Sequence, residues 1–321
     1  MNYKALSLET YYCIINTYKG IKIMFRKMLV PLDGSEVSEV TFNYANELAS
    51  RFAGLEVILL HVCSNKDTVA MHRMYIESSA DKIRADAQKS SGNKGIKVRG
   101  ELLTGTPADE ILRFAHENGI DLILMATHGR SGISRWAMGS VAYKVLRQAN
   151  IPVLMVRAGI EDAIILDQLP ERRILVALDG TKSAETILPE VEALGRQWGI
   201  DVVQIILIRT CEPATVSSDY PSDMVESWEA RVQQENLKCK LVAGAYLANV
   251  EKRFREAGFK VRSELPLGNP AQEIISSSVK NRANLIAMVI HGRSGISRWA
   301  YGSTAEEVMI GARTPILLVR G

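Results

Sequence analysis

Ala-Thr-His-Gly-Arg-Ser-Gly-Ile-Ser-Arg-Trp-Ala-Met-Gly-Ser, residues 126–140, is the stretch that decides the fold of this chain. Its central residues 128–137 recur without a change at 291–300. An apolar run of strand length, 121–126, precedes the stretch, and a helical pattern with serine at its N-cap begins at Ser140. A strand followed by a glycine-containing loop and the start of a helix is an arrangement that offers backbone N–H groups and the positive end of the helix to an anion. Two such copies favour a phosphate site over a plain flexible connection.

The repeat extends outward over most of the chain. The strand pattern that ends at Asp33 recurs at Asp179, and the segment that begins at Lys97 recurs at Lys260. In each copy, apolar strands alternate with helices, which predicts a parallel sheet covered on both faces. Each copy is therefore expected to be a doubly wound, Rossmann-like α/β domain. Its ligand should bind beyond the carboxyl ends of the strands, where the strand order reverses.

Four segments are expected along the chain. They are an N-terminal extension at 1–25, a first domain at 26–157, a linker at 158–171 and a second domain at 172–321. The extension is rich in tyrosine and isoleucine, but charged residues interrupt it. It therefore predicts neither a signal peptide nor a membrane span, and translation from Met24 is an open alternative. The second copy has a longer helix and loop between its second and third strands.

Composition limits the classes of function. Hydrophobic residues are 47% of the 321 residues, charged residues are 23%, and the net charge is +3, which is an ordinary globular balance. No basic cluster is interleaved with aromatic residues, so we expect no nucleic-acid partner and no membrane partner. The cysteines show neither CxxC spacing nor a metal-like grouping with histidine, so we expect reduced thiols in a cytoplasmic protein; they are Cys13, Cys63, Cys211 and Cys239.

In this arrangement the chain resembles the universal stress protein family, in its tandem two-domain form. The resemblance covers 26–157 and 172–321. Nucleotide-binding members carry G-x2-G-x9-G-[ST] after the fourth strand. The corresponding segments here are Ala126-x2-Gly129-x9-Gly139-Ser140 and Val289-x2-Gly292-x9-Gly302-Ser303.

The leading glycine of that motif is thus replaced in both copies. Alanine at 126 is a small change, whereas valine at 289 is β-branched and poorly suited to close ligand approach. We therefore expect nucleotide to bind tightly in the first domain and more weakly, or not at all, in the second.

The resemblance implies a sheet in the order 3-2-1-4-5, with ATP, alone or with Mg²⁺, lying across strands 1 and 4. In the first domain it implies nucleotide contacts from Pro31, Leu32, Asp33, Val62, Gly105, Met125, Ala126, His128, Gly129, Arg130, Gly132, Gly139, Ser140 and Val141. In the second domain it implies contacts from Ala177, Leu178, Asp179, Ile208, Gly268, Met288, Val289, His291, Gly292, Arg293, Gly295, Gly302, Ser303 and Thr304. Ile208 is placed in this set only by its spacing from Asp179.

Asp33 and Asp179 end the first strand of each copy and have two interpretations. Each could cap the following helix, but its position at the strand-order reversal favours ligand contact. His128 and His291 have no repeat-matched nucleophile or acid near them in the sequence. We interpret them as loop-shaping or ligand-contacting residues, and we expect no catalytic residue.

Two further pairs of loop residues leave their role open. Arg130 and Arg293 fit a phosphate contact and a solvated loop arginine equally well. Trp136 and Trp299 are expected to pack against the sheet or a partner rather than on adenine.

Three hypotheses of function remain. Neither copy has the G-K-[ST] ending of a Walker A loop, and without that lysine fast phosphoryl transfer is not expected. The leading hypothesis is therefore a regulatory, non-enzymatic stress-response protein that binds ATP. The alternatives are a nucleotide-independent scaffold for assembly and a weak ATPase or autophosphorylating protein.

The fifth strands predict how the two copies are joined. Residues 153–156 and 316–319 are apolar, and an uncovered apolar edge strand invites aggregation. We expect these strands to lie against each other within one chain, about an approximate twofold axis. The family resemblance implies in addition that two chains form a homodimer.

Overall fold

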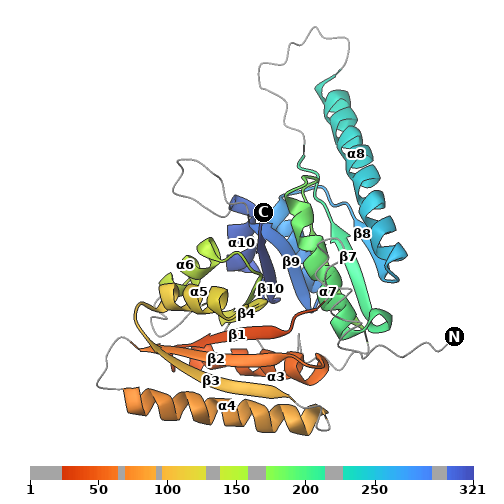
Figure 1. Ribbon diagram of the computed structural model, residues 1–321. Coiled ribbons are helices and arrows are strands. Elements are labelled where there is room, and N and C mark those ends of the chain that lie inside the picture. Colours follow the sequence, from red (N-terminus) through yellow and green to blue (C-terminus); the bar gives the residue numbers. More distant parts are fainter. Residues whose placement is uncertain are drawn as a thin grey trace, which may run out of the picture.

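The computed structural model describes residues 24–63, 69–91, 96–127, 138–157, 171–213, 227–290 and 302–321. Its strands form one ten-stranded sheet in the order β3-β2-β1-β4-β5-β10-β9-β6-β7-β8 (Figure 1). The first half contains β1 (Lys27–Leu32), β2 (Glu56–Cys63), β3 (Lys97–Thr104), β4 (Leu122–Ala126) and β5 (Val153–Val156). The second half contains β6 (Arg172–Ala177), β7 (Val203–Ile208), β8 (Lys260–Glu264), β9 (Leu285–Ile290) and β10 (Ile316–Arg320). Strands are parallel within each half. The order of strands in each half confirms the predicted 3-2-1-4-5 order.

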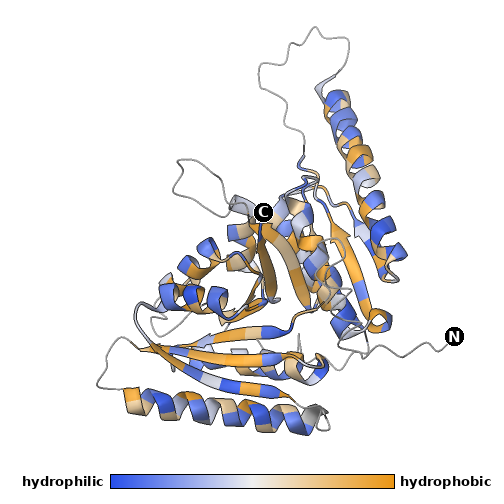
Figure 2. Ribbon diagram, in the orientation of Figure 1, coloured by the Kyte–Doolittle hydropathy of each residue, from blue (hydrophilic) through white to orange (hydrophobic). Residues whose placement is uncertain are grey.

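Helices cover both faces of each half. The first half has α2 (Glu36–Glu39), α3 (Thr41–Arg51), α4 (Val69–Ser91), α5 (Pro107–Glu117) and α6 (Ser140–Gln148). The second half has α7 (Leu188–Trp198), α8 (Trp228–Glu256), α9 (Pro270–Lys280), α10 (Ser303–Gly311) and the short 3₁₀ helices η3 (Ala184–Ile187) and η4 (Ile200–Val202). One core cluster lies under α3, α4, α7 and α8, and the other lies under α5, α6, α9 and α10. Figure 2 shows the resulting pattern, with apolar strands inside and helices that are polar on their outer side.

The two halves meet at an antiparallel pair of strands. β5 pairs with β10, with Leu154 opposite Leu317 at the centre of the register. Together they complete one continuous sheet, so the predicted pairing of the fifth strands is confirmed.

Polar side chains strengthen this junction. Arg172 on β6 donates to Glu47 on α3 at 2.8 Å, and the two side chains are only 6% and 11% exposed. The Gln197 amide both accepts from the Phe25 N–H, at 2.7 Å, and donates to the Phe25 carbonyl, at 2.9 Å. Phe25 itself is completely buried, although the expected boundary placed it in the extension.

Side chains cap the starts of α2, α8 and α9, whereas the predicted cap of α6 is wrong. Ser35 caps α2 by accepting from Ser38 N, and Asn269 caps α9 by accepting from Gln272 N at 3.0 Å. Ser140, however, is not the N-cap of α6. That position is Gly139, no side chain caps the helix, and Ser140 is its first residue. The N-terminal N–H groups of α6 therefore point out of the helix without a capping side chain.

The cysteines require a second correction. We expected reduced thiols, but Cys211 and Cys239 form a disulfide, with their Cα atoms 6.1 Å apart. Cys239 lies on α8, which is the predicted longer helix of the second copy: α8 has 29 residues and α4 has 23. The N-terminal half of α8 projects beyond the sheet (Figure 1). Cys63 is a buried free thiol, and Cys13 lies outside the described residues.

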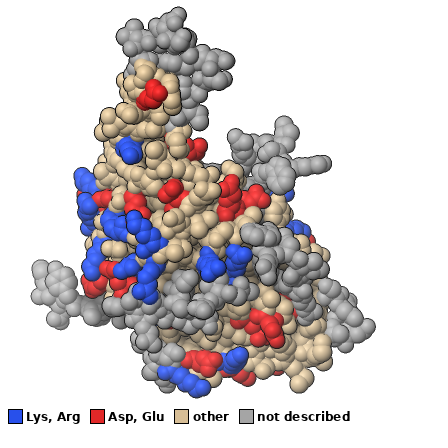
Figure 3. Space-filling model, turned by 180° about the vertical axis from the view of Figure 1, so that it is seen from behind, with Lys and Arg blue, Asp and Glu red and all other residues tan. Residues whose placement is uncertain are grey.

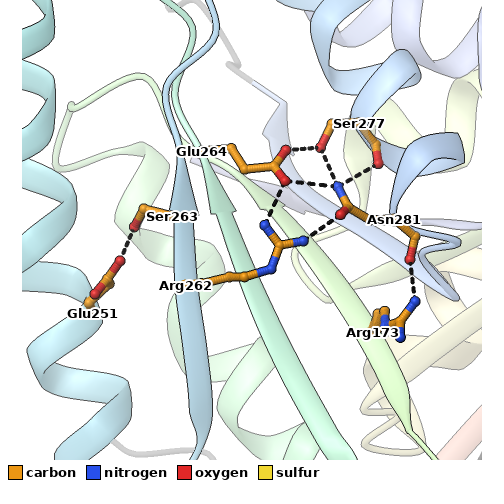
Figure 4. Close-up of polar contacts among 7 residues, drawn as sticks. All are labelled: Arg173, Glu251, Arg262, Ser263, Glu264, Ser277 and Asn281. Atoms are coloured by element: carbon orange, nitrogen blue, oxygen red, sulfur yellow. Dashed lines mark hydrogen bonds and ion pairs between the residues drawn. The ribbon is translucent and has the colours of Figure 1, made fainter.

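A polar network fastens the far edge of the second half (Figure 4). Glu264 on β8 accepts from Ser277 at 2.6 Å, from Arg262 at 2.6 Å and from Asn281 at 3.0 Å. Arg173 on β6 donates to the Asn281 carbonyl at 3.0 Å, so β8, α9 and β6 are linked.

On the face of the molecule drawn in Figure 3, basic and acidic side chains are interspersed.

Candidate functional site

A cavity of about 260 Å³ opens where β1 and β4 end, and we call it the first pocket. Among the residues expected to contact nucleotide, the structure brings together here Pro31, Leu32, Asp33, Val62, Met125, Ala126, Gly139, Ser140 and Val141. Sequence reasoning missed other residues of its wall, which are Ser38, Leu60, Pro107, Ile111 and Ala142. The first pocket is therefore a mainly apolar space with one carboxylate and a helix N-terminus at its edge.

The second pocket, of about 390 Å³, lies at the matching place in the second half. Of the expected residues, the structure gathers here Ala177, Leu178, Asp179, Ile208, Met288, Val289, Gly302, Ser303 and Thr304. Its remaining wall is Ala184, Arg209, Thr210, Glu212, Pro270, Ile274 and Ala305. Both volumes are near the lower end of the range for small-molecule sites, about 300–1,000 Å³. Val289 lines the second pocket and does not close it.

Strand register establishes which residues of the two pockets are equivalent. Leu60 pairs with Pro31 and Ile208 pairs with Ala177, so these two apolar residues correspond. It follows that Thr210, and not Ile208, is the counterpart of Val62. The second half has two more residues between its first and second strands, which simple spacing from Asp179 overlooks.

The aspartates at the ends of the first strands shape tight turns. Asp33 Oδ1 accepts from Ser35 N at 3.0 Å and from Ser35 Oγ at 2.6 Å, and Ser35 in turn caps α2. Asp179 Oδ1 accepts from Thr181 N and Oγ1 at 2.8 and 2.7 Å, in the same way. Asp33 thus holds Ser35, which caps α2, and Asp179 holds Thr181, whose hydroxyl accepts from Ala184 N at 3.1 Å. Each aspartate also lines its pocket, and its contact with a ligand stays a prediction.

The helices that begin at the pockets differ in one backbone feature. Gly302 precedes α10 with φ +79°, a left-handed conformation that favours glycine, whereas Gly139 has φ −59°. Gly139 N donates to the Thr127 carbonyl at 2.9 Å, which holds the start of α6 against the end of β4. In both halves, the first N–H groups of a nine-residue helix border the pocket.

Two expected contact residues lie elsewhere. Gly105 and Gly268 are not among the residues that line the pockets. The Gly105 N–H bonds to the Cys63 carbonyl at 3.1 Å, and the Gly268 N–H bonds to the Cys211 carbonyl at 3.0 Å. A side chain at Gly105 would meet Glu110 at 2.8 Å. These glycines position the helices α5 and α9 whose proline and isoleucine side chains form the pocket walls.

A tyrosine of the outer helix lies near each pocket aspartate. Tyr75 on α4 donates to Glu39 at 3.1 Å. Burial, followed by the Glu39 charge, raises the pKa of Tyr75 well above its ordinary value. Burial and Glu185 likewise raise the pKa of Tyr246 on α8 to about 12. Both phenols are therefore protonated at neutral pH.

Part of the expected loop lies outside the described residues. This applies to His128, Gly129, Arg130, Gly132 and Trp136 in the first half, and to His291, Gly292, Arg293, Gly295 and Trp299 in the second. Within the described ranges, no group of three or more His, Cys, Asp or Glu side chains could hold a metal ion. In the same part of the chain, no helix has the length and apolarity to cross a membrane.

Comparison with known proteins gives the family. Residues 24–157 and 171–320 both match the family described as the universal stress protein family. A universal stress protein of Methanocaldococcus jannaschii is 30% identical over 155 residues, which cover 46% of this chain and 91% of that protein. One from Mycobacterium tuberculosis is 23% identical over 243 residues, or 75% of each chain.

Solved structures agree on the fold. The crystal structure of a universal stress protein from Archaeoglobus fulgidus is similar with a TM-score of 0.63 at 21% identity, covering 92% of this chain and 98% of that one. At this identity the likeness concerns the fold alone. Because both halves match the family, the chain belongs to the universal stress protein family, in its tandem two-domain form.

Proposed function

We propose that this chain is a regulatory protein that binds ATP, with one adenine-nucleotide site in each half. The observation that carries the proposal is the pair of equivalent pockets at the carboxyl ends of β1 and β4 and of β6 and β9. In doubly wound folds this is the position at which ligands bind. On this proposal 26–157 and 172–321 are two nucleotide-binding domains, joined by the linker 158–171 and preceded by the extension 1–25.

The first pocket suits the parts of ATP. Leu60, Val62 and Met125 provide apolar walls for a flat base, and Leu60 and Met125 are at most 5% exposed. The Asp33 carboxylate at the edge can accept a hydrogen bond from a ribose hydroxyl. The start of α6 offers backbone N–H groups and a positive dipole end, together with the exposed Ser140 hydroxyl, to phosphate oxygens.

The second pocket suits the same ligand less well at one position. Val289 occupies the position that Ala126 has in the first pocket, and this residue is only 6% exposed. On this proposal the larger, β-branched side chain of valine would leave less room than alanine for the close approach of a phosphate to the backbone. We therefore propose tighter binding in the first domain than in the second.

We further propose that ATP is bound and not rapidly turned over. Backbone N–H groups and a helix dipole hold the phosphates equally well before and during bond cleavage, and such uniform binding does not accelerate a reaction. If Mg²⁺ enters with the nucleotide, Asp33 or Ser140 would help to hold it, and the ion would neutralise phosphate charge. Turnover should be far below the ~1–100 s⁻¹ of kinases.

A scaffold role is the second candidate. The continuous sheet across β5 and β10 joins the halves without any ligand, so assembly could be the main function. We propose that two such chains form a homodimer in the cytoplasm. On the scaffold hypothesis, dimer formation would not depend on nucleotide.

Nucleotide content decides between these candidates. The full chain is purified without added nucleotide, denatured, and its supernatant analysed by chromatography for adenine nucleotides per chain. The regulatory proposal predicts that the chain co-purifies with ATP or binds ATP when it is added. The variants Asp33→Asn and Gly139→Asp should lose this ATP binding. Absence of nucleotide together with no heat of ATP binding would support the scaffold. Steady-state ADP release in the kinase range, abolished by Gly139→Asp, would make the chain an enzyme.

A further inference from the structure

The Cys211–Cys239 disulfide lies next to the wall of the second pocket. Thr210 and Glu212, the neighbours of Cys211 in the chain, both line that pocket. Cys211 is completely buried and continues the pairing of β7 with the chain after β8, because its N–H bonds to the Pro266 carbonyl at 2.9 Å. The disulfide therefore connects the segment 209–212, which we call the pocket rim, to the outer helix α8.

α8 contacts the pocket rim at two places. Besides the disulfide from Cys239, Tyr246 lies under the Arg209 guanidinium, with Cζ 5.3 Å from the ring centroid. Cys239 and Tyr246 are seven positions apart, or two helical turns, so they lie on the same side of α8. The face of α8 that contacts the core begins only at Ala243 and continues to Phe254. Cys239 thus provides a covalent contact between the pocket rim and the part of α8 that precedes its buried face.

The first half provides a matched comparison without this bond. Cys63 is the counterpart of Cys211, and its carbonyl accepts from Gly105 as that of Cys211 accepts from Gly268. Its sulfur lies 3.8 Å from the Thr104 hydroxyl and is a free thiol. The helix α4 contains no cysteine. The two pockets therefore share one architecture and differ in a covalent tie to the outer helix.

We propose that the Cys211–Cys239 pair is a redox-responsive site that sets how firmly the rim of the second pocket is held. Cys239 is partly exposed whereas Cys211 is completely buried, so a low-molecular-weight thiol would attack at Cys239 rather than at Cys211. The incoming thiolate forms a bond to the Cys239 sulfur, the Cys211–Cys239 bond breaks, and Cys211 leaves as a thiolate that takes up a proton. A second thiol then releases Cys239 as a thiol and yields the oxidised low-molecular-weight disulfide.

The reduced state should loosen the rim and the projecting part of α8. The oxidised state holds Thr210 and Glu212 in place before a ligand arrives, and such preorganisation favours binding. The ligand part of this inference rests on the nucleotide function proposed above. The response of the rim to thiols does not.

Hydrogen exchange on the full chain tests both parts. The protein is equilibrated with reduced or oxidised glutathione, the disulfide is verified by non-reducing peptide mapping, and amide exchange is followed with and without ATP. On reduction, peptides covering 209–213 and 228–242 should exchange at least about tenfold faster. The reason is that the disulfide no longer restricts local opening of the pocket rim and of α8. Half-maximal ATP protection at 302–305 should require roughly tenfold more ATP.

Two variants serve as controls. Cys239→Ser should behave as the reduced protein under both conditions, whereas Cys63→Ala should leave the response intact. Protection at 139–142 in the first pocket should not change with redox state. Redox-dependent exchange at the rim with no ATP protection in either pocket would support the redox site and overturn the nucleotide function. Rim exchange that is identical in both states would overturn the redox site, whether or not ATP binds.

Discussion

His61 in the first half and Arg209 in the second occupy equivalent positions, and each lies against a tyrosine of the outer helix. The His61 ring meets Tyr75 edge-on at 6.0 Å, and the Arg209 guanidinium lies 5.3 Å from the centre of Tyr246. His61 also bonds through Nδ1 to the Leu32 carbonyl at 2.8 Å. Arginine is charged at every physiological pH, so the second pocket has a permanent cation in its wall and the first has none at this position.

Arg209→Leu should therefore weaken binding of a phosphate-bearing ligand in the second pocket. The loss should be on the order of 0.5–1 kcal/mol, or a few-fold in affinity, because the pocket is open to solvent. Calorimetric titration with ATP at low and high salt measures it, since the wild type should lose more affinity with salt than the variant. Arg209→Lys keeps the charge and should lose less. Equal affinities for the wild type and Arg209→Leu at low salt would contradict the prediction.

Exchanging the residues at the start of the two loops should exchange the strength of the two sites. Val289→Ala should raise ATP affinity in the second pocket, and Ala126→Val should lower it in the first, each by about tenfold, which is about 1.4 kcal/mol. Exchange protection at 302–305 and 139–142 reports the two sites separately. If Val289→Ala binds no better than the wild type, valine is not the reason for a weaker second site.

The buried pair at the junction should matter more than an exposed pair. Glu47→Gln removes the carboxylate partner of Arg172 in a largely buried place, so the free energy of unfolding should fall by about 3 kcal/mol. Glu117→Gln affects the Arg113–Glu117 pair, whose side chains are 48% and 51% exposed, and should cost less than about 1 kcal/mol. Urea denaturation of both variants gives the comparison. Similar losses for the two would refute this ranking.

The network around Glu264 should make stability depend on acid. Burial alone would raise the pKa of this carboxyl, but hydrogen bonds from Ser277, Arg262 and Asn281 outweigh it and lower the pKa below 4.5. A carboxyl whose pKa is lower in the folded state stabilises the protein when the pH is above its pKa in the unfolded chain. This stabilisation is lost as the pH falls through its pKa in the folded state.

Glu264→Gln should accordingly reduce Tm most at neutral pH. The difference from the wild type should shrink once the pH falls below about 4, where the carboxyl is protonated in the unfolded chain. Thermal melts from pH 7 to pH 3 measure this difference. A difference that stays constant over the whole range would show that the charge of Glu264 contributes nothing.

The alternation of strands and helices and the junction are predictable from the sequence for a physical reason, whereas the 3-2-1-4-5 order is what the family resemblance implies. Buried parallel strands are apolar throughout and are separated by helices, so they stand out twice in the same order. An apolar fifth strand in each copy has few places to be buried other than against its twin. The turn aspartates could also be predicted, because they directly follow the first strands, and the residues after Gly139 could be predicted from the helical pattern that begins at Ser140.

Other features depended on information that spacing does not carry. Arg209 and Thr210 were missed because two additional residues shift the second strand relative to Asp179. Pro107 and Ile111 had a signal, since the segment recurs as Pro270 and Ile274, but it was assigned only to a helix start. The disulfide joins residues 28 positions apart, and one of them, Cys239, lies in the lengthened helix α8, whose counterpart α4 contains no cysteine.

The antiparallel union of β5 with β10 has a consequence for how such a protein can change. In an assembly of two identical chains, every substitution occurs at both symmetry-related positions. When one chain contributes both halves, a substitution occurs once, so Ala126 and Val289 can differ without cost to the twin site. The covalent connection also keeps the halves at a high effective concentration however dilute the protein is. The fold thus maintains two non-identical pockets in a constant one-to-one ratio, which no mixture of separate chains guarantees.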